Sequence, residues 1–317
     1  MNYLVENVFE PQMKGTREGF GEAMVELGRR NKSVVALSGD LRESLRMVEF
    51  GKAYPERFIE VGVAEQNMAG VGAGLALCGK IPFLCSFAVF SPGRNWDQIR
   101  VSVAYTNANV KIIGGHAGIS VGQDGATHQA LEDIALMRAL PNMIVVAPCD
   151  AEQAKKATMA MADHVGPVYM RLTRPKTAIF TSPSAHFEIG KAQILREGKE
   201  VTLVACGPLV YQALLAADGL QGVIDVEVIN MHTIKPLDVE TLLKSVKKTG
   251  KVVTLEDHQI NGGLGSAVAE VLGERLPTKI KRMGMMDRFG ESGDSTALLA
   301  KYGLDKKGII KTIKEFK

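Results

Sequence analysis

The sequence predicts an α/β protein of two domains, each a mostly parallel sheet flanked by helices. Short apolar runs alternate with helical spacing along most of the 317 residues, a rhythm typical of parallel sheets. The alternation is interrupted at Arg174–Glu188, where prolines and a Thr/Ser cluster indicate a linker. The length also suits two domains, and we place them at residues 1–185 and 186–317.

The first half contains short, β-rich runs bounded by turn residues. The expected strands are Val34–Ser38, Arg57–Val61, Ile81–Phe87, Val110–Gly115, Met143–Ala147 and Val168–Leu172. The expected helices are Thr16–Arg30, Met68–Leu77, Asn95–Thr106, His128–Leu140 and Ala151–Ala162. A parallel sheet with helices on both faces follows from this order.

A second, smaller alternation follows the linker. Its expected strands are Val201–Cys206, Val226–Asn230, Val252–Glu256 and Lys279–Met283, and its expected helices are Leu209–Ala217, Asp238–Lys247 and Leu264–Leu276. We expect a second α/β domain of ordinary size from this pattern.

The composition indicates an ordinary globular protein, with 46% hydrophobic and 23% charged residues. The net charge of +3 and the scattered basic residues give no case for nucleic acid. No apolar run has membrane-spanning length and the start does not resemble a secretory signal, so we expect no membrane partner and a cytoplasmic location. The four cysteines, which lack CxxC spacing, are expected to be buried, reduced thiols.

Glu65 is the acidic residue that opens an apolar, glycine-rich helix, and two interpretations of it stay open. A carboxylate in a first helical turn accepts free backbone N–H groups and complements the helix dipole. However, Met68–Leu77 has almost no polar face, so we expect this helix to be packed on all sides and its N-terminus to be shielded from water. A carboxylate there is a candidate proton handler or ligand acceptor. A dinucleotide site is not indicated, because G-x-G-x-x-G is absent.

A glycine-rich loop, GGHAGISVGQDGATHQ, follows the expected strand Val110–Gly115. It carries His116, Asp124 and His128 where open α/β sheets usually bind ligands. A turn with satisfied polar groups is the simplest interpretation, and a metal site is conceivable but lacks a recognised ligand spacing. Neutral donors and acceptors for a polyhydroxylated substrate fit the residue types better.

Aromatic and basic residues are also expected at or near the carboxyl ends of the strands of the first sheet. Phe87 and Phe90 are either core residues or a platform for a ring. Arg17, Arg171 and Arg174 are either solvated or parts of a phosphate site that combines guanidinium groups with a helix N-terminus.

Several segments together resemble the C-terminal half of transketolase, comprising its pyrimidine-binding and C-terminal domains. The matching stretches are SGDLRES (38–44), RFIEVGVAEQNM (57–68), CSFAVFSPGRNWDQIR (85–100), GGHAGISVGQDGATHQALED (114–133), RLTRP (171–175), HTIKPLD (232–238) and LEDHQINGGLGSAV (255–268). They occur in the family's order and cover nearly the whole chain.

The resemblance implies an enzyme that depends on thiamine diphosphate and transfers a two-carbon ketol unit from a ketose to an aldose, as in the pentose phosphate pathway. It implies that Glu65 shares a proton with N1′ of the coenzyme's aminopyrimidine, and that Phe87 and Phe90 form the pocket for that ring.

The same resemblance assigns residues to the substrate. His116, Asp124 and His128 face the sugar, and Arg17, Ser44 and Arg174 hold its phosphate with His116 adjacent. Arg171 is a weaker match. His258 matches a family position, but a structural role is at least as consistent with its sequence context.

In the family, a preceding domain with GDG and an asparagine pair holds the diphosphate and its divalent metal, Mg or Ca. We find no such segment in the sequence. We therefore expect a split transketolase, whose separate N-terminal subunit supplies the diphosphate and metal site and whose assembly contains two copies of each chain. The alternatives are the β subunit of a 2-oxoacid dehydrogenase and a non-catalytic assembly or regulatory subunit.

Overall fold

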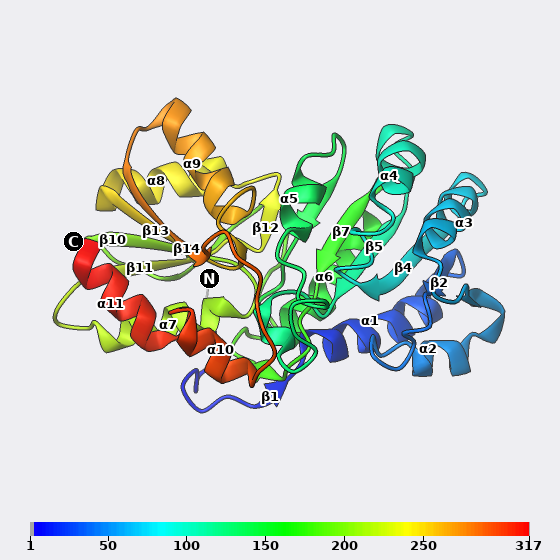
Figure 1. Ribbon diagram of the computed structural model, residues 1–317, viewed down its shortest axis with the longest axis horizontal. Coiled ribbons are helices and arrows are strands. Elements are labelled where there is room, and N and C mark those ends of the chain that lie inside the picture. The colour runs from blue at the N-terminus through cyan, green and yellow to red at the C-terminus, as the bar shows by residue number, and fades with distance from the viewer. Residues whose placement is uncertain (1–2, 317) are drawn as a thin grey trace.

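The computed structural model describes residues 3–316 and contains two main sheets that lie side by side (Figure 1). The first has seven strands in the order β12-β6-β7-β5-β4-β2-β3. These are β2 (Val34–Ser38), β3 (Phe58–Glu60), β4 (Ile81–Phe87), β5 (Lys111–Gly115), β6 (Ile144–Val146), β7 (Val168–Arg171) and β12 (Thr233–Lys235). All neighbours are parallel except β12, which runs antiparallel to β6.

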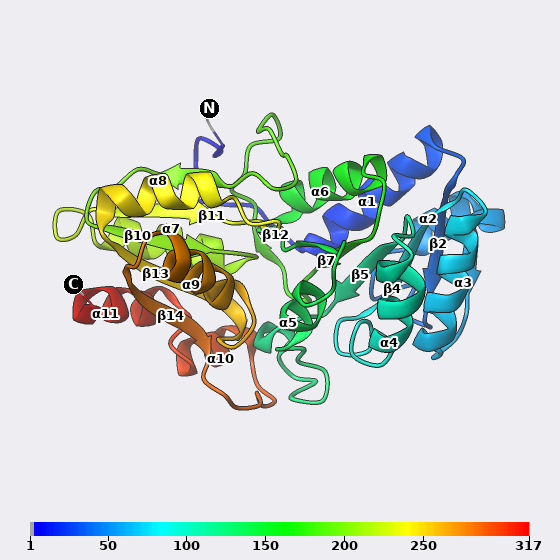
Figure 2. The ribbon, with the colours of Figure 1, turned by 90° about the horizontal axis from the view of Figure 1, so that it is seen from above.

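Helices cover both faces of this sheet, as seen from above in Figure 2. They are α1 (Thr16–Arg30), α2 (Val48–Ala53), α3 (Glu65–Leu77), α4 (Trp96–Gln98) with the π-helix η2 (Ile99–Tyr105), α5 (Asp133–Arg138) and α6 (Ala151–Asp163). In β2, Val34 and Ala36 join the core beneath α1 and α6, whereas Val35 and Leu37 join the core beneath α3 and η2. This alternation is the period of two that a strand imposes on its side chains.

The second sheet has five strands in the order β14-β13-β10-β11-β9. They are β9 (Gln193–Arg196), β10 (Val201–Ala205), β11 (Val226–Asn230), β13 (Lys251–Gln259) and β14 (Lys279–Met285), and only β9 is antiparallel to its neighbour. Its helices are α7 (Leu209–Gly219), α8 (Val239–Thr249), α9 (Leu264–Arg275), α10 (Ser295–Lys301) and α11 (Lys306–Phe316). A two-stranded ribbon pairs β1 (Met13–Lys14) with β8 (Thr177–Ala178).

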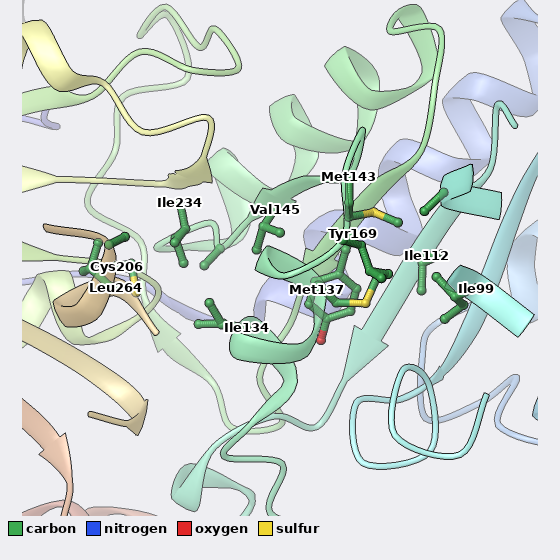
Figure 3. Close-up of a cluster of buried hydrophobic side chains, with 14 of the residues drawn as sticks. Ile99, Ile112, Ile134, Met137, Met143, Val145, Tyr169, Cys206, Ile234 and Leu264 are labelled. Carbon is green, nitrogen blue, oxygen red and sulfur yellow. The ribbon is translucent and has the colours of Figure 1, made fainter. Parts of the chain in front are cut away.

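One hydrophobic core runs between the two sheets. Figure 3 shows Ile112, Val145 and Tyr169 of the first sheet in the same cluster as Cys206 and Leu264 of the second half. Ile234 of β12 belongs to it too. Because β12 comes from the second half and completes the first sheet, the two halves are joined by backbone pairing as well as by side-chain packing.

The predicted α/β class with two parallel sheets is confirmed, although several local predictions are wrong. The helix expected at His128–Leu140 is shorter and covers only Asp133–Arg138, since His128 lies in a turn and Ala130 forms a β-bridge with Ala117. The segment expected as a linker contains β8 and is anchored by Asp150, whose carboxylate accepts the N–H groups of Phe180 and Thr181. Cys78 is exposed at the end of α3, whereas the other three cysteines are buried as predicted.

Helix α3 is not packed on all sides. Met68, Gly72 and Ala73 face the core, but Gly70 and Gly74 are exposed, and a Cβ atom at either would have no neighbour within 4 Å. An apolar sequence of small residues has no polar face to show which side meets solvent, so periodicity alone could not reveal this exposed side.

Candidate active site

The Glu65 side chain is buried at the first turn of α3, where the sequence predicted it. Ser86 Oγ donates to Glu65 Oε1 over 3.1 Å, and Arg94 Nη1 donates to Oε2 over 2.6 Å. Within the described residues, no backbone N–H of α3 donates to this carboxylate. The capping interpretation therefore does not account for Glu65, because its partners are side chains from β4 and the following turn.

Four rings form a cluster next to this carboxylate. Phe87 stacks on His116 with ring centroids 3.9 Å apart, and on Phe90 at 6.0 Å. The edge of His128 meets both phenylalanines, at 6.2 and 5.5 Å. Arg94 connects the cluster to Glu65, because its guanidinium lies over the Phe90 ring, 4.7 Å from the centroid.

His116 is neutral and has an unused nitrogen. It follows β5 with a left-handed backbone (φ 53°) and is only 3% exposed. Burial and the nearby charges of Arg17 and Arg174 lower the pKa of His116 to about 3. Among the described residues, its buried Nδ1 has no hydrogen-bond partner. Since buried polar atoms are normally paired, this nitrogen is available to a ligand.

The loop between β5 and α5 brings the other expected substrate residues to the same edge. Asp124 Oδ1 lies 3.4 Å from Arg174 Nη1, and the His128 ring Nδ1 lies 2.9 Å from Thr127 Oγ1. The loop begins after β5 and Arg174 follows β7, so both stand at the carboxyl ends of parallel strands, as predicted.

The second half of the chain holds this loop in place. The Asp257 carboxylate, on β13, accepts the N–H groups of Ile119 (2.9 Å) and Ser120 (3.4 Å). Ser295 Oγ donates to the Ser120 carbonyl over 2.7 Å. A Cβ at Gly118 would lie 2.1 Å from the Asp257 carboxylate, so this close approach requires glycine there.

A basic cavity of about 340 Å³ lies beside the loop. Arg17, Arg46, Arg174 and Lys176 contribute cations to its wall, and residues 293–295 of the second half close one side. Arg17 Nη1 donates to the Ser44 carbonyl over 2.9 Å, and Arg174 Nη1 to that of Val121, also over 2.9 Å. Arg17 and Arg174 are thus brought together in one wall, whereas Ser44 does not line this cavity and contacts Arg17 only through its backbone carbonyl.

Arg171 and His258 lie outside this cavity, in the packing between the halves. Arg171 is buried and pairs with Asp133 at 2.9 Å, while its Nη2 donates to the Asp257 carbonyl over 2.6 Å. His258 is fully buried, with Nδ1 2.7 Å from the Gln259 carbonyl oxygen. These contacts support a structural role for both residues and remove Arg171 from the suggested phosphate site.

Sequence reasoning missed Ser86, Arg94, Arg46 and Asp257. Ser86 is hidden within an apolar strand, and the two arginines occur in segments rich in charge and turns, so no local pattern distinguishes them. Within residues 3–316, no three His, Cys, Asp or Glu side chains gather closely enough to hold a metal ion. None of the helices in that range combines the length and apolarity needed to cross a bilayer.

Two family models cover most of the chain: "Transketolase, pyrimidine binding domain" matches residues 12–178, and "Transketolase, C-terminal domain" matches residues 190–309. The chain belongs to the transketolase family. A relative from Methanocaldococcus jannaschii, described as a transketolase C-terminal section, is 49% identical over 306 residues, covering 95% of this chain and 96% of the relative.

Two further relatives are named as transketolase subunits. The 6-deoxy-6-sulfo-D-fructose transketolase subunit of a Clostridium species is 44% identical and matches 94% of this chain and 93% of its own length. An apulose-4-phosphate transketolase subunit of Phocaeicola vulgatus is 40% identical, with 96% and 98% covered. A solved split-gene transketolase, described as an inactive β4 tetramer, superposes with a TM-score of 0.89 at 47% identity, over 95% of this chain and 98% of that one. The chain is therefore of the C-terminal subunit type of a split transketolase.

Proposed function

We propose that this transketolase subunit contributes the proton-handling and sugar-binding half of an active site that transfers a two-carbon ketol unit from a ketose to an aldose. The observation that carries the proposal is the buried Glu65 carboxylate beside the cluster of Phe87, Phe90, His116 and His128. A desolvated carboxylate forms strong hydrogen bonds and is a suitable partner for a protonated heteroaromatic nitrogen.

The residues around Glu65 fit the aminopyrimidine half of thiamine diphosphate. Phe87 and Phe90 offer apolar ring surface, and Glu65 presents one oxygen held by Ser86 and another held by the half-exposed Arg94. When bound, thiamine diphosphate supplies the carbon nucleophile that carries the two-carbon unit. Glu65 holds the proton exchanged at N1′, and the apolar rings exclude water around it.

His116, His128 and Asp124 are the proposed sugar-binding residues. A neutral His116 donates or accepts a hydrogen bond without presenting a cation, so it suits a hydroxyl group or a carbonyl oxygen. His128 contacts Phe87, the ring on which His116 stacks, and both histidines are proposed to move protons at the sugar oxygens. Asp124 is proposed to accept from a sugar hydroxyl, and its ion pair with Arg174 supports this by holding its carboxylate.

The anionic end of the sugar is proposed to bind in the basic cavity, at Arg17 and Arg174, with Ser44 contributing from beside Arg17. Guanidinium groups match the geometry of phosphate oxygens. The two relatives named as subunits act, by their names, on sugars with an acidic group, a sulfonate in one case and a phosphate in the other. We propose a sugar phosphate for this chain. The sugars in these two names are not those of the pentose phosphate pathway. We propose that pathway as one cellular role for this chain.

A separate N-terminal subunit is proposed to hold the diphosphate and its Mg or Ca ion. Relatives of matching length are named as subunits, which supports a second polypeptide. We further propose that residues 1–185 and 186–317 correspond to the two family domains and that the assembly is cytoplasmic.

Self-association is proposed to use the exposed face of α3. Val63, in the bend before α3, is 68% exposed and Leu77, the last residue of α3, is 77% exposed, and the exposed Gly70 and Gly74 lie between them in the chain. Exposed apolar surface of this kind indicates an interface. A second copy of this chain is the proposed occupant, which gives a two-fold dimer and, with the N-terminal subunits, a heterotetramer. The solved relative is described as forming a tetramer of β chains.

The two alternative functions are less consistent with these findings. The family models and relatives name transketolases and not 2-oxoacid dehydrogenases. A purely structural subunit has no need of a buried carboxylate whose side-chain donors, in the part of the chain that the structure describes, are one serine and one half-exposed arginine, since such a charge costs free energy to bury.

Reconstitution tests the proposal. The purified chain, given thiamine diphosphate and Mg²⁺, is assayed for ketol transfer alone and after addition of an N-terminal subunit from the same source. We expect turnover only in the mixture. Turnover by the chain alone contradicts the split site, and consumption of pyruvate by the mixture without ketol transfer favours the dehydrogenase alternative.

A further inference from the structure

Arg46 lies in the basic cavity, and the family resemblance gives this arginine no role. It lies in the wall of that cavity with Arg17, Arg174 and Lys176. The carboxylates in the same wall are those of Glu18 and Asp294. Asp294 is already used, because its Oδ1 accepts the N–H groups of Thr296 and Ala297 at the start of α10.

The backbone places Arg46 in the cavity at a conformational cost. Arg46 has φ 61°, a left-handed conformation that L-residues other than glycine rarely adopt. A Cβ at Gly21 would lie 2.6 Å from both the Cβ and the carbonyl oxygen of Arg46. Glycine at position 21 of α1 therefore lets the turn that carries Arg46 lie directly against the helix.

Glu18 fixes the direction of the Arg46 side chain. Glu18 Oε1 lies 3.3 Å from Arg46 Nη2, and Glu18 Oε2 accepts the Gly15 N–H at the start of α1. The Arg46 side chain is still 44% exposed. A single contact to one carboxylate oxygen leaves most of the five guanidinium N–H donors available to a ligand.

The cations of the cavity are close enough to influence one another. Apart from burial, Arg46 is the largest contributor to the lowered pKa of Arg17, and it also helps to lower the pKa of His116. Arg17 Nε is buried, and no group in residues 3–316 forms a hydrogen bond with it. Three guanidinium groups that repel one another, one of them with an unpaired buried nitrogen, are stabilised when an anion enters.

We propose that Arg46 is a specificity-determining residue which makes this subsite prefer a doubly charged terminal phosphate over a singly charged or uncharged sugar end. The inference rests on the proposed function, since it assumes that the cavity receives the end of the sugar. Coulomb attraction scales with the charge of the ligand, so a third cation favours a dianion about twice as strongly as a monoanion at the same distance. Arg17 and Arg174 provide the electrostatic attraction that every anionic ligand experiences in this cavity.

The test compares sugars that differ only in the terminal group. Arg46→Gln and Arg46→Lys are assembled with the N-terminal subunit, and kcat/KM is measured for ribose 5-phosphate and for ribose as acceptors. Arg42→Gln is the matched control, because Arg42 is exposed on the same turn but does not line the cavity. We expect Arg46→Gln to lower kcat/KM about 10-fold for the phosphorylated sugar, the scale of one charge-assisted contact. Ribose should change less than twofold, Arg46→Lys should lose less, and Arg42→Gln should match the unmodified chain.

A second measurement does not depend on turnover. Inorganic phosphate is titrated into each purified variant by calorimetry at low ionic strength, and Arg46→Gln should bind it several-fold more weakly than the unmodified chain and Arg42→Gln. Equal losses with both sugars, or unchanged phosphate binding, overturn the proposal. If the assembled enzyme transfers ketol units to neither sugar, the proposed function fails, whereas the phosphate titration still decides the role of Arg46.

Discussion

The Arg94 guanidinium lies 2.6 Å from Glu65 Oε2 and rests on the Phe90 ring, 4.7 Å from its centroid. Arg94 thus pairs with the buried carboxylate and covers one of the two rings proposed for the coenzyme. Its side chain is 44% exposed, whereas that of Glu65 is 1% exposed. The arginine is therefore the partner that can move when a coenzyme ring takes its place.

Replacing Arg94 with Gln should show whether Arg94 only pairs with Glu65 in the absence of coenzyme or also holds the coenzyme. The variant loses the ion pair only in the state without coenzyme, so that state should be destabilised by about 1 kcal/mol, as for a partly exposed pair. By linkage, apparent affinity for thiamine diphosphate should rise about fivefold. Calorimetric titration of the assembled enzyme measures this affinity. Weaker coenzyme binding by the variant would show instead that Arg94 holds the coenzyme directly.

Asp257→Asn tests whether the second half positions the substrate loop. The amide keeps one acceptor for the Ile119 or Ser120 N–H but turns a donor toward the other, which leaves a buried group unpaired. We expect KM for the sugars to rise about 10-fold, with coenzyme affinity unchanged. An equal loss of coenzyme affinity would indicate general destabilisation of the fold.

Gly74→Arg tests the proposed α3 interface. The side chain has open space in the isolated chain, and arginine favours helix more than glycine does, so folding should be unharmed. A bulky cation in a two-fold contact should prevent association, as measured by sedimentation. Gly273→Arg is the control, since Gly273 is exposed on α9 with equally open space. Unchanged association of Gly74→Arg would place the interface elsewhere.

The buried His232 should make the stability of the fold sensitive to acid. Burial lowers the pKa of His232 from its ordinary 6.5 to about 3. The unfolded chain takes up a proton near pH 6.5 that the folded chain does not accept until about pH 3. Stability from this residue is therefore complete above pH 6.5 and is lost as the pH falls toward 3.

His232→Gln should remove that contribution to the pH dependence. Between pH 7 and pH 5, the melting temperature of the variant should fall less steeply than that of the unmodified chain. The slopes are compared rather than the absolute values, because the substitution also changes packing against Phe187. Identical slopes would mean that His232 takes up its proton at the same pH in the folded and the unfolded chain, which contradicts the lowered pKa.

Much of the fold could be predicted because its elements have strong local periods. Thr16–Arg30, Val34–Ser38, Ile81–Phe87 and Val226–Asn230 were predicted with the bounds that the structure has. β12 was missed because three residues show no period, and its pairing with β6 depends on partners almost 90 residues away. The π-helix at Ile99–Tyr105 was predicted as ordinary helix, since a helical pattern in the sequence does not show which carbonyl each backbone N–H will meet.

The candidate site was predictable where its residues follow strands. Glu65, Phe87, His116 and Arg174 each lie at or after the end of a parallel strand, and those strand ends meet at one edge. Arg94 and Asp257 were not predictable from local patterns. Arg94 contacts Glu65, 29 residues away in the chain, and Asp257 contacts Ile119, more than 130 residues away. Such contacts are set by tertiary packing and leave no local pattern.

The central claim concerns the Glu65 carboxylate, and Glu65→Gln tests it most directly. Glutamine retains an acceptor for Ser86 Oγ and nearly the same volume, but it cannot hold the exchanged proton. With the N-terminal subunit, thiamine diphosphate and Mg²⁺, we expect an intact assembly whose ketol-transfer rate is at least about 100-fold lower, the common scale for a lost proton-transfer group. An assembled Glu65→Gln enzyme with the full rate would contradict the account.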